Sequence, residues 1–154
     1  MPTSHRAAIA AIAAIRALPD ELERTLATLD EATLDRPYRD GGWTRRQVVH
    51  HIADSHMNAY VRMKLILTED HPTLRPYDQD TWAALPDSAG PVAPTLQLIR
   101  GLHTRWADLL DTLDAAAWRR TAHHPEDGEV VLGDLVEKYA GHGAHHVRQL
   151  KSQN

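Results

Sequence analysis

Histidine is concentrated in two groups in this chain of 154 residues, which contains eleven histidines and no cysteine. The members of the two groups are His50, His51 and His56 in the first half of the chain, and His142, His145 and His146 near its end. Neutral imidazole is the commonest protein ligand of transition metals, because it offers a lone pair without carrying a charge. The pattern therefore indicates a metal-binding protein. The absence of cysteine excludes disulfides and a thiol nucleophile carried by the chain itself.

Spacing selects His142 and His146 as a pair of ligands for one ion. Residues four apart on a helix lie on one face, with Cβ atoms about 6 Å apart. The apolar face of this last helix consists of Leu132, Val136, Tyr139, Gly143, Val147 and Leu150. On a helical wheel His146 falls within that face and His142 at its edge, whereas His145 points away. One histidine from another helix would complete a three-histidine site with an open coordination position, the arrangement of catalytic zinc.

Helix geometry does not decide which histidine of the first group is the third ligand. On a helical wheel His56 lies in the middle of the apolar face, and His50 and His51 lie on its opposite margins. Periodicity alone selects His56, whereas a site at the open end of a helical bundle would take its ligand from a margin, as His50 or His51. Asp54 lies three residues after His51 and is either a hydrogen-bond acceptor that orients that ring or an exposed helix charge.

Four long amphipathic helices are predicted to position these residues. Apolar residues recur every three or four positions in the segments 4–29, 44–68, 94–113 and 132–150. Ser4 and Thr44 are the expected N-caps, and Pro19 is expected to kink the first helix or to split it in two. The expected fold class is all-α, a four-helix bundle formed as a single domain over residues 1–154.

The connections between these helices are polar and rich in turn-forming residues. Residues 69–91 join the second and third helices, carry four prolines and are expected to form a long surface connection that Trp82 pins. Loops of this length in a compact domain are often functional. Residues 119–130 are expected to be polar and turn-like around Pro125.

The composition argues against several classes of protein. The net charge is −4, and the lysines and arginines are spread out, so the basic stripe of a nucleic-acid binder is missing. No apolar stretch approaches the roughly 20 residues needed to cross a bilayer. The first residues lack the pattern of a signal peptide, so a cytoplasmic location is expected.

The stretch from Gly41 to Asn58, which contains the first histidine group, resembles the DinB superfamily and in particular its YfiT-like branch. The resemblance extends to residues 67–70, 75–78 and 82 and to the closing Gly-His-Gly-Ala-His-His of residues 141–146, and so covers most of the chain from about residue 35. It implies a four-helix bundle, usually a homodimer, that binds zinc or nickel through His51, His142 and His146. It therefore selects His51, where the helical wheel selects His56.

An open three-histidine site can activate a nucleophile in two ways. A bound divalent ion can lower the pKa of water to about 7, or deprotonate a bound thiol. A zincin-type peptidase is disfavoured, because Gly143 stands where that signature has its glutamate. The resemblance implies transfer of a small-molecule thiol, of the bacillithiol type, to an electrophilic substrate in detoxification, with metal-dependent hydrolysis as the alternative. A third possibility is a non-catalytic metal-binding stress-response protein with a closed site, in which His56 or His145 is the fourth ligand.

Overall fold

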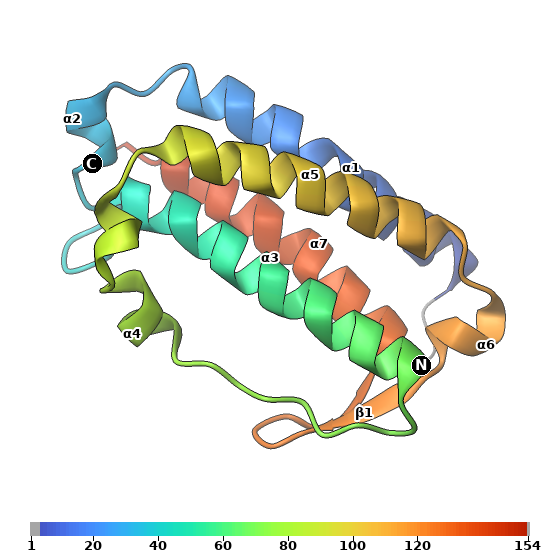
Figure 1. Ribbon diagram of the computed structural model, residues 1–154. Coiled ribbons are helices and arrows are strands. Elements are labelled where there is room, and N and C mark those ends of the chain that lie inside the picture. Colours follow the sequence, from blue (N-terminus) through green and yellow to red (C-terminus); the bar gives the residue numbers. More distant parts are fainter. Residues whose placement is uncertain (1–3, 154) are drawn as a thin grey trace.

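The computed structural model describes residues 4–153. Four long helices form a bundle, as predicted (Figure 1): α1 (His5–Leu26), α3 (Arg45–Thr68), α5 (Val92–Asp111) and α7 (Leu132–Lys151). The helix α1 packs against α5 and α7, and α3 packs against the same two helices. Consecutive bundle helices α1 and α3 therefore lie diagonally opposite each other.

The helix starts follow the predicted caps. The side chain of Ser4 accepts a hydrogen bond from the backbone N–H of Ala7, and Thr44 forms a complete capping box with Gln47. Such caps satisfy backbone N–H groups that have no partner within the helix. Pro19 does not split the first helix, which runs without a break through that residue, so the alternative of two helices is wrong.

The long connection between α3 and α5 runs back along the outside of the bundle (Figure 1). It must be long because α5 runs parallel to α3, whose 24 residues span about 36 Å. It contains the short helix α4 (Gln79–Ala83) and the 3-10 helix η1 (Pro86–Ala89). The prediction that Trp82 pins it is wrong, because this residue is 37% exposed and its ring packs against Tyr77 of the same connection. The buried residues of the connection are Pro72, Leu74, Ala83 and Ser88.

The segment predicted to be turn-like contains a short antiparallel hairpin, β1 (Thr121–His124) and β2 (Gly128–Val131), which corrects the expectation for residues 119–130. The backbone N–H of Leu74 donates to the carbonyl of His123, and the N–H of His123 donates to the carbonyl of Pro72. These bonds tie the long connection to the hairpin. Two further short helices complete the chain, α2 (Glu31–Leu34) and α6 (Ala115–Trp118).

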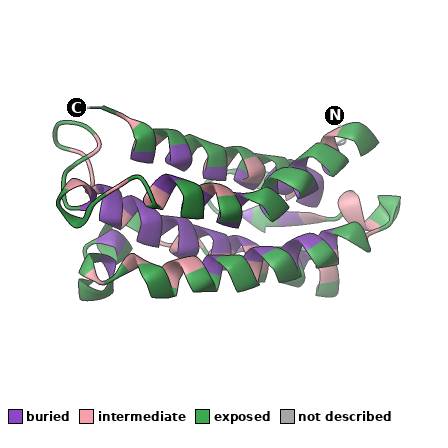
Figure 2. Ribbon diagram, turned by 90° about the horizontal axis from the view of Figure 1, so that it is seen from above, coloured by how far each residue is buried: buried purple, intermediate pink, exposed green. Residues whose placement is uncertain are grey.

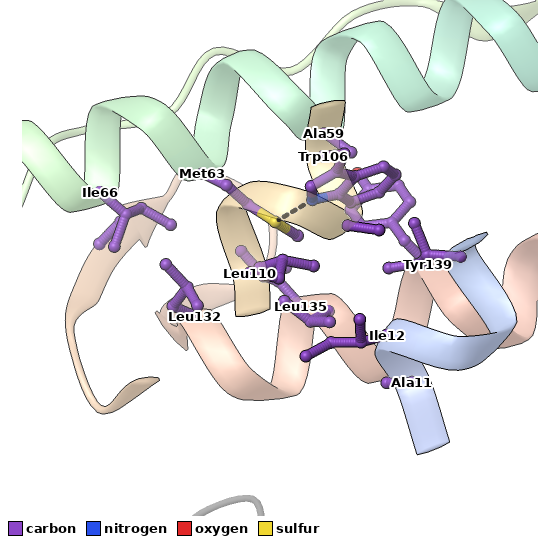
Figure 3. Packing of buried hydrophobic residues seen from close by; sticks show 14 of the residues in the cluster. Ala11, Ile12, Ala59, Met63, Ile66, Trp106, Leu110, Leu132, Leu135 and Tyr139 are labelled. Atoms are coloured by element: carbon purple, nitrogen blue, oxygen red, sulfur yellow. Dashed lines mark hydrogen bonds between the residues drawn. The ribbon is translucent and has the colours of Figure 1, made fainter. Parts of the chain in front are cut away.

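The buried faces of the long helices meet along the bundle axis (Figure 2) and form two apolar clusters. The Trp106 cluster comprises Ala11, Ile12, Ile15, Ala59, Met63, Ile66, Leu74, Trp106, Ala107, Leu110, Ala122, Leu132, Leu135, Val136 and Tyr139. The Val48 cluster comprises Leu18, Leu22, Val48, Val49, Ile52, Ala53, Ile99, Val147 and Leu150. Figure 3 shows the first of these, in which the indole N–H of Trp106 donates to the sulfur of Met63 at 3.1 Å.

Histidines occupy the level between the two clusters. On α3, His56 falls between Ala53 of the Val48 cluster and Ala59 of the Trp106 cluster. On α5, His103 falls between Ile99 and Trp106 in the same way. Both histidines are fully buried, so the apolar core is interrupted by a polar layer at this level.

Gly143 allows α7 to approach α1 closely at the same level. A Cβ atom placed on Gly143 would lie 2.8 Å and 3.1 Å from the two methyl groups of buried Leu18. A side chain there would force the methyl groups of Leu18, a member of the Val48 cluster, to shift. By contrast, a Cβ atom on Gly141 would meet nothing within 4 Å.

We expect Gly143→Ala to be less stable than Gly141→Ala by about 1–3 kcal/mol, the usual effect of overpacking a core. The second variant is the matched control, because it makes the same change two residues away in the same helix and gains helix propensity. Urea denaturation of both variants measures the difference. Equal stabilities would contradict the close packing of α7 on α1.

Candidate metal centre

Two antiparallel helices bring the candidate ligands together near one end of the bundle (Figure 1). His51 lies in the second turn of α3, and His142 and His146 lie in the last three turns of α7. Buried Arg45 ties these helix ends to each other, since its guanidinium donates to the carbonyls of Leu150 and Ser152. These hydrogen bonds hold the start of α3 against the end of α7, and so help to set the distance between His51 and the two histidines of α7.

The three imidazoles of His51, His142 and His146 converge on one point. The Nε2 atom of His142 lies 3.3 Å from Nε2 of His51 and 2.9 Å from Nε2 of His146. One ring nitrogen from each histidine lies within 4.8 Å of the others. Two nitrogens bound to zinc at 2.0–2.1 Å are about 3.3–3.4 Å apart at a tetrahedral angle and about 2.8–3.0 Å apart at a right angle. Both distances from Nε2 of His142 therefore match those between two ligands of one divalent ion.

Burial keeps these imidazoles neutral and thus able to donate a lone pair. Desolvation, with a smaller effect of neighbouring His146, lowers the pKa of His51 to about 4. Desolvation and the nearby histidines lower the pKa of His142 to about 3. The pKa of His146 is also lowered by burial, although its hydrogen bond to Gln149 opposes the shift. A cluster of neutral imidazoles with facing nitrogens is suited to a cation.

The Nδ1 atoms of His146 and His142, on the far side of each ring from the cluster, are also engaged. The Nδ1 atom of His146 lies 2.7 Å from Oε1 of Gln149, an acceptor, so this nitrogen donates and Nε2 keeps its lone pair. The Nδ1 atom of His142 lies 3.0 Å from Nε2 of His56. The ring of His51 packs against the indole of Trp43 at a centroid distance of 4.8 Å. Outer contacts of this kind orient the ligands of a metal and fix their tautomers.

The other histidines of the two groups have different partners. Both nitrogens of His50 are used at the start of α5, by the hydroxyl of Thr95 at 2.8 Å and the carbonyl of Gly90 at 2.9 Å. Exposed His145 contacts Gln149. His56 is fully buried, as the helical wheel predicts, but it faces the opposite edge of the His142 ring. Among the described residues, the convergent group of possible ligands is His51, His142 and His146.

Asp54 does not contact His51. Its half-buried carboxyl group makes no hydrogen bond to a histidine among residues 4–153, and the pKa of this group is raised to about 6 by burial and by nearby Asp87. The histidine that sequence reasoning missed is His103, whose Nε2 lies 2.7 Å from Nδ1 of His56. Its spacing from Ile99 and Trp106 on the inner face of α5 is the signal that could have identified it.

A pocket of about 450 Å³ opens onto the cluster. Trp43, Arg39 and neighbouring residues of the turn-rich segment line one side, and Gln79 and Asp80 of α4 line another. The long connection therefore borders the site, in line with its predicted role. A smaller pocket of about 260 Å³ lies beside His142, lined by Arg62, Tyr77 and Tyr139 among others.

Comparisons with known proteins show the family of this chain. The family model of the DinB superfamily matches residues 14–150. A protein of Bacillus mycoides named "putative metal-dependent hydrolase" is 50% identical over 138 residues, which cover 90% of this chain and 80% of that protein. A protein of Bacillus cereus with the same name is 49% identical over the same shares.

A solved structure is similar to this chain in both sequence and fold. It is YfiT from Bacillus subtilis, described as a probable metal-dependent hydrolase with an unusual four-helix bundle topology. It is 40% identical with a TM-score of 0.93, and the match covers 96% of this chain and 86% of that chain. In the part of the chain that the structure describes, no helix has the length and apolar character needed to cross a membrane.

Proposed function

Since this chain belongs to the DinB superfamily, we propose that it is a metal-dependent enzyme whose ion is held by His51, His142 and His146. The observation that carries the proposal is the convergence of three neutral imidazoles at the edge of an open pocket. A site with three protein ligands and one accessible side is typical of catalytic zinc. Nickel also suits three imidazoles, so the proposed cofactor is one zinc or nickel ion per chain.

The proposed reaction is transfer of a small-molecule thiol, of the bacillithiol type, to an electrophilic small molecule. When bound, the divalent ion would lower the pKa of a thiol that coordinates it. The protein holds the ion with neutral side chains, and Trp43 shields one side of the cluster. A thiol deprotonated in this way needs no basic side chain. Consistent with this, no carboxylate belongs to the convergent group among the described residues.

Hydrolysis of an electrophilic substrate is the second candidate, and the names of the Bacillus relatives favour it. The same ion would activate water, but a general base usually assists the attack of water on a substrate. Asp80 is the carboxylate that lines the pocket, and it lies on α4 rather than on a helix that carries the histidines. A hydrolase would therefore take its base from the long connection.

We expect the zinc- or nickel-loaded protein to consume an electrophile, such as an epoxide or a haloaromatic compound, faster with bacillithiol than with water alone. Mass spectrometry of the products separates the thioether from the hydrolysis product. Protein stripped of metal with a chelator is the control, and it should form neither product above the background rate. Equal consumption with and without thiol would reject thiol transfer and leave hydrolysis.

The proposed oligomeric state and biological role rest on the family resemblance. We propose a homodimer that removes electrophiles by joining them to a thiol. Sedimentation velocity over a range of protein concentrations measures the assembly, and a monomer throughout that range would reject the dimer.

A further inference from the structure

A proline inside α1 leaves one buried backbone carbonyl without its helical donor. Pro19 lies four residues after Ile15 within the unbroken helix. In a regular helix the N–H of residue 19 would donate to the carbonyl of residue 15, but proline has no N–H, and its ring pushes against that carbonyl. Ile15 is 1% exposed, so water does not reach its carbonyl to replace the missing donor. A buried carbonyl of this kind requires another partner.

His103 provides that partner. Its Nδ1 atom lies 2.6 Å from the carbonyl oxygen of Ile15. A carbonyl can only accept, so Nδ1 of His103 carries the proton and donates it. In a neutral imidazole the other nitrogen, Nε2, is then bare and must accept. The proline-freed carbonyl thus decides the tautomer of His103.

The same rule passes along two further contacts. The Nδ1 atom of His56 lies 2.7 Å from the bare Nε2 of His103, so it must donate. The Nε2 atom of His56 is then the acceptor, and Nδ1 of His142, 3.0 Å away, donates to it. His142 is left with a bare Nε2, the nitrogen that lies closest to His51 and His146. Reversing the order would set two acceptors 2.6 Å apart at the Ile15 carbonyl.

Apolar and aromatic groups surround these histidines, so the rings have few other hydrogen-bond partners. The rings of Trp106 and Tyr139 pack edge-on around His56, at centroid distances of 5.7 Å and 5.8 Å. Apolar clusters lie on both sides of the layer. The three hydrogen bonds therefore connect Ile15 of α1, through His103 of α5 and His56 of α3, to His142 of α7, and each ring donates from Nδ1.

We propose that Pro19, through the Ile15 carbonyl, sets the tautomers of His103 and His56, so that His142 presents its Nε2 lone pair to the metal. His56 and His103 are positioning residues, because they act on the metal through His142. This inference rests on the proposed metal centre, but the tautomers themselves exist in the metal-free protein. They can therefore be measured whether or not an ion binds.

The direct test is long-range ¹H–¹⁵N correlation of the imidazole rings in metal-free, ¹⁵N-labelled protein near neutral pH. We expect His103 and His56 each to carry the proton on Nδ1, which is the less common tautomer of histidine in solution. A proton on Nε2 of His103 or His56 would overturn the proposal. Failure of the protein to bind any ion would reject the proposed function and leave this result intact.

A pair of variants at position 103 tests the effect on the metal. His103→Leu removes the bonds to Ile15 and His56, and we expect zinc to bind up to about 10-fold more weakly, less than the 10- to 100-fold that is usual when a ligand histidine loses its own outer hydrogen bond. His103→Gln can donate its amide N–H to Ile15 and accept from His56, so most of the affinity should return. Circular dichroism confirms that each variant is folded. Equal zinc affinity of the leucine and glutamine variants would contradict the proposal.

Pro19→Ala tests the origin of this series of hydrogen bonds. The restored N–H at residue 19 competes with His103 for the Ile15 carbonyl, so zinc affinity should fall in the wild-type background. In the His103→Leu background the same change should have no effect on affinity, because the series is already broken. A double-mutant cycle measures this coupling. Equal effects in both backgrounds would show that Pro19 acts independently of the histidines.

Discussion

Replacing His142 with alanine is expected to weaken the binding of zinc or nickel by more than about 100-fold, beyond the usual effect of losing an outer contact. His142 is the central ligand, because its Nε2 lies within 3.3 Å of the Nε2 atoms of both other histidines. Its loss leaves two ligands on different helices and also breaks the contact with His56. Competition with a chelator of known affinity measures the change.

His145→Ala is the matched control for this prediction. It removes another histidine of the same helix, three residues away, whose exposed ring contacts Gln149 and no member of the convergent group through a hydrogen bond. We expect its affinity to stay close to that of the unchanged protein. If both variants bind equally well, the ion is held elsewhere. If His145→Ala is the weaker binder, the helical face has been assigned incorrectly.

The metal-free protein is expected to lose stability steeply as the pH falls below about 6.5. Burial lowers the pKa of His51 and His103 to about 4 and that of His142 to about 3, and it holds the pKa of His56 well below its ordinary value. The unfolded chain protonates these histidines near pH 6.5, whereas the folded chain does not. Acid therefore favours the unfolded state throughout the interval between the two pKa values.

The size of the effect follows from the number of protons involved. Each proton that only the unfolded chain binds adds about 1.4 kcal/mol per pH unit to the slope of stability against pH. Asp54 acts in the opposite sense, because its pKa is raised to about 6 in the folded state and it takes up a proton there that the unfolded chain does not. One carboxyl group offsets only part of the contribution of four histidines.

Urea denaturation of chelator-treated protein between about pH 7.5 and about pH 5 measures this dependence. We expect the free energy of unfolding to fall continuously across this range. The His103→Gln variant is the control, since it lacks one titrating group and should show a shallower slope. A free energy that is constant, or that rises as the pH falls, would show that the buried histidines are not neutral.

Local sequence patterns predict the bundle and two of the three ligands proposed for the metal. The apolar spacing in α1, α3, α5 and α7 reports which face is buried, and the Thr44–Gln47 capping box marks where α3 begins. The pair His142 and His146 follows from helix geometry alone. These features depend on contacts within one helix, so the sequence is sufficient to predict them.

Features that depend on two distant segments could not be predicted in this way. Whether His50, His51 or His56 faces α7 depends on how α3 is rotated against it, and the family resemblance rather than the wheel pointed to His51. His103 stands alone in the sequence, and its role appears only when α5 is placed against α1 and α3. The hairpin of β1 and β2 is short and is tied to Pro72 and Leu74 of a distant connection.

X-ray absorption spectroscopy at the zinc edge of the zinc-loaded, tag-free protein tests the central claim most directly. We predict three imidazole nitrogens at about 2.0–2.1 Å together with at least one further light atom that is not imidazole, from solvent at an open position. Four imidazoles would indicate a closed, non-catalytic site that includes His56 or His145. Two or fewer, or no retained zinc, would contradict the three-histidine metal centre.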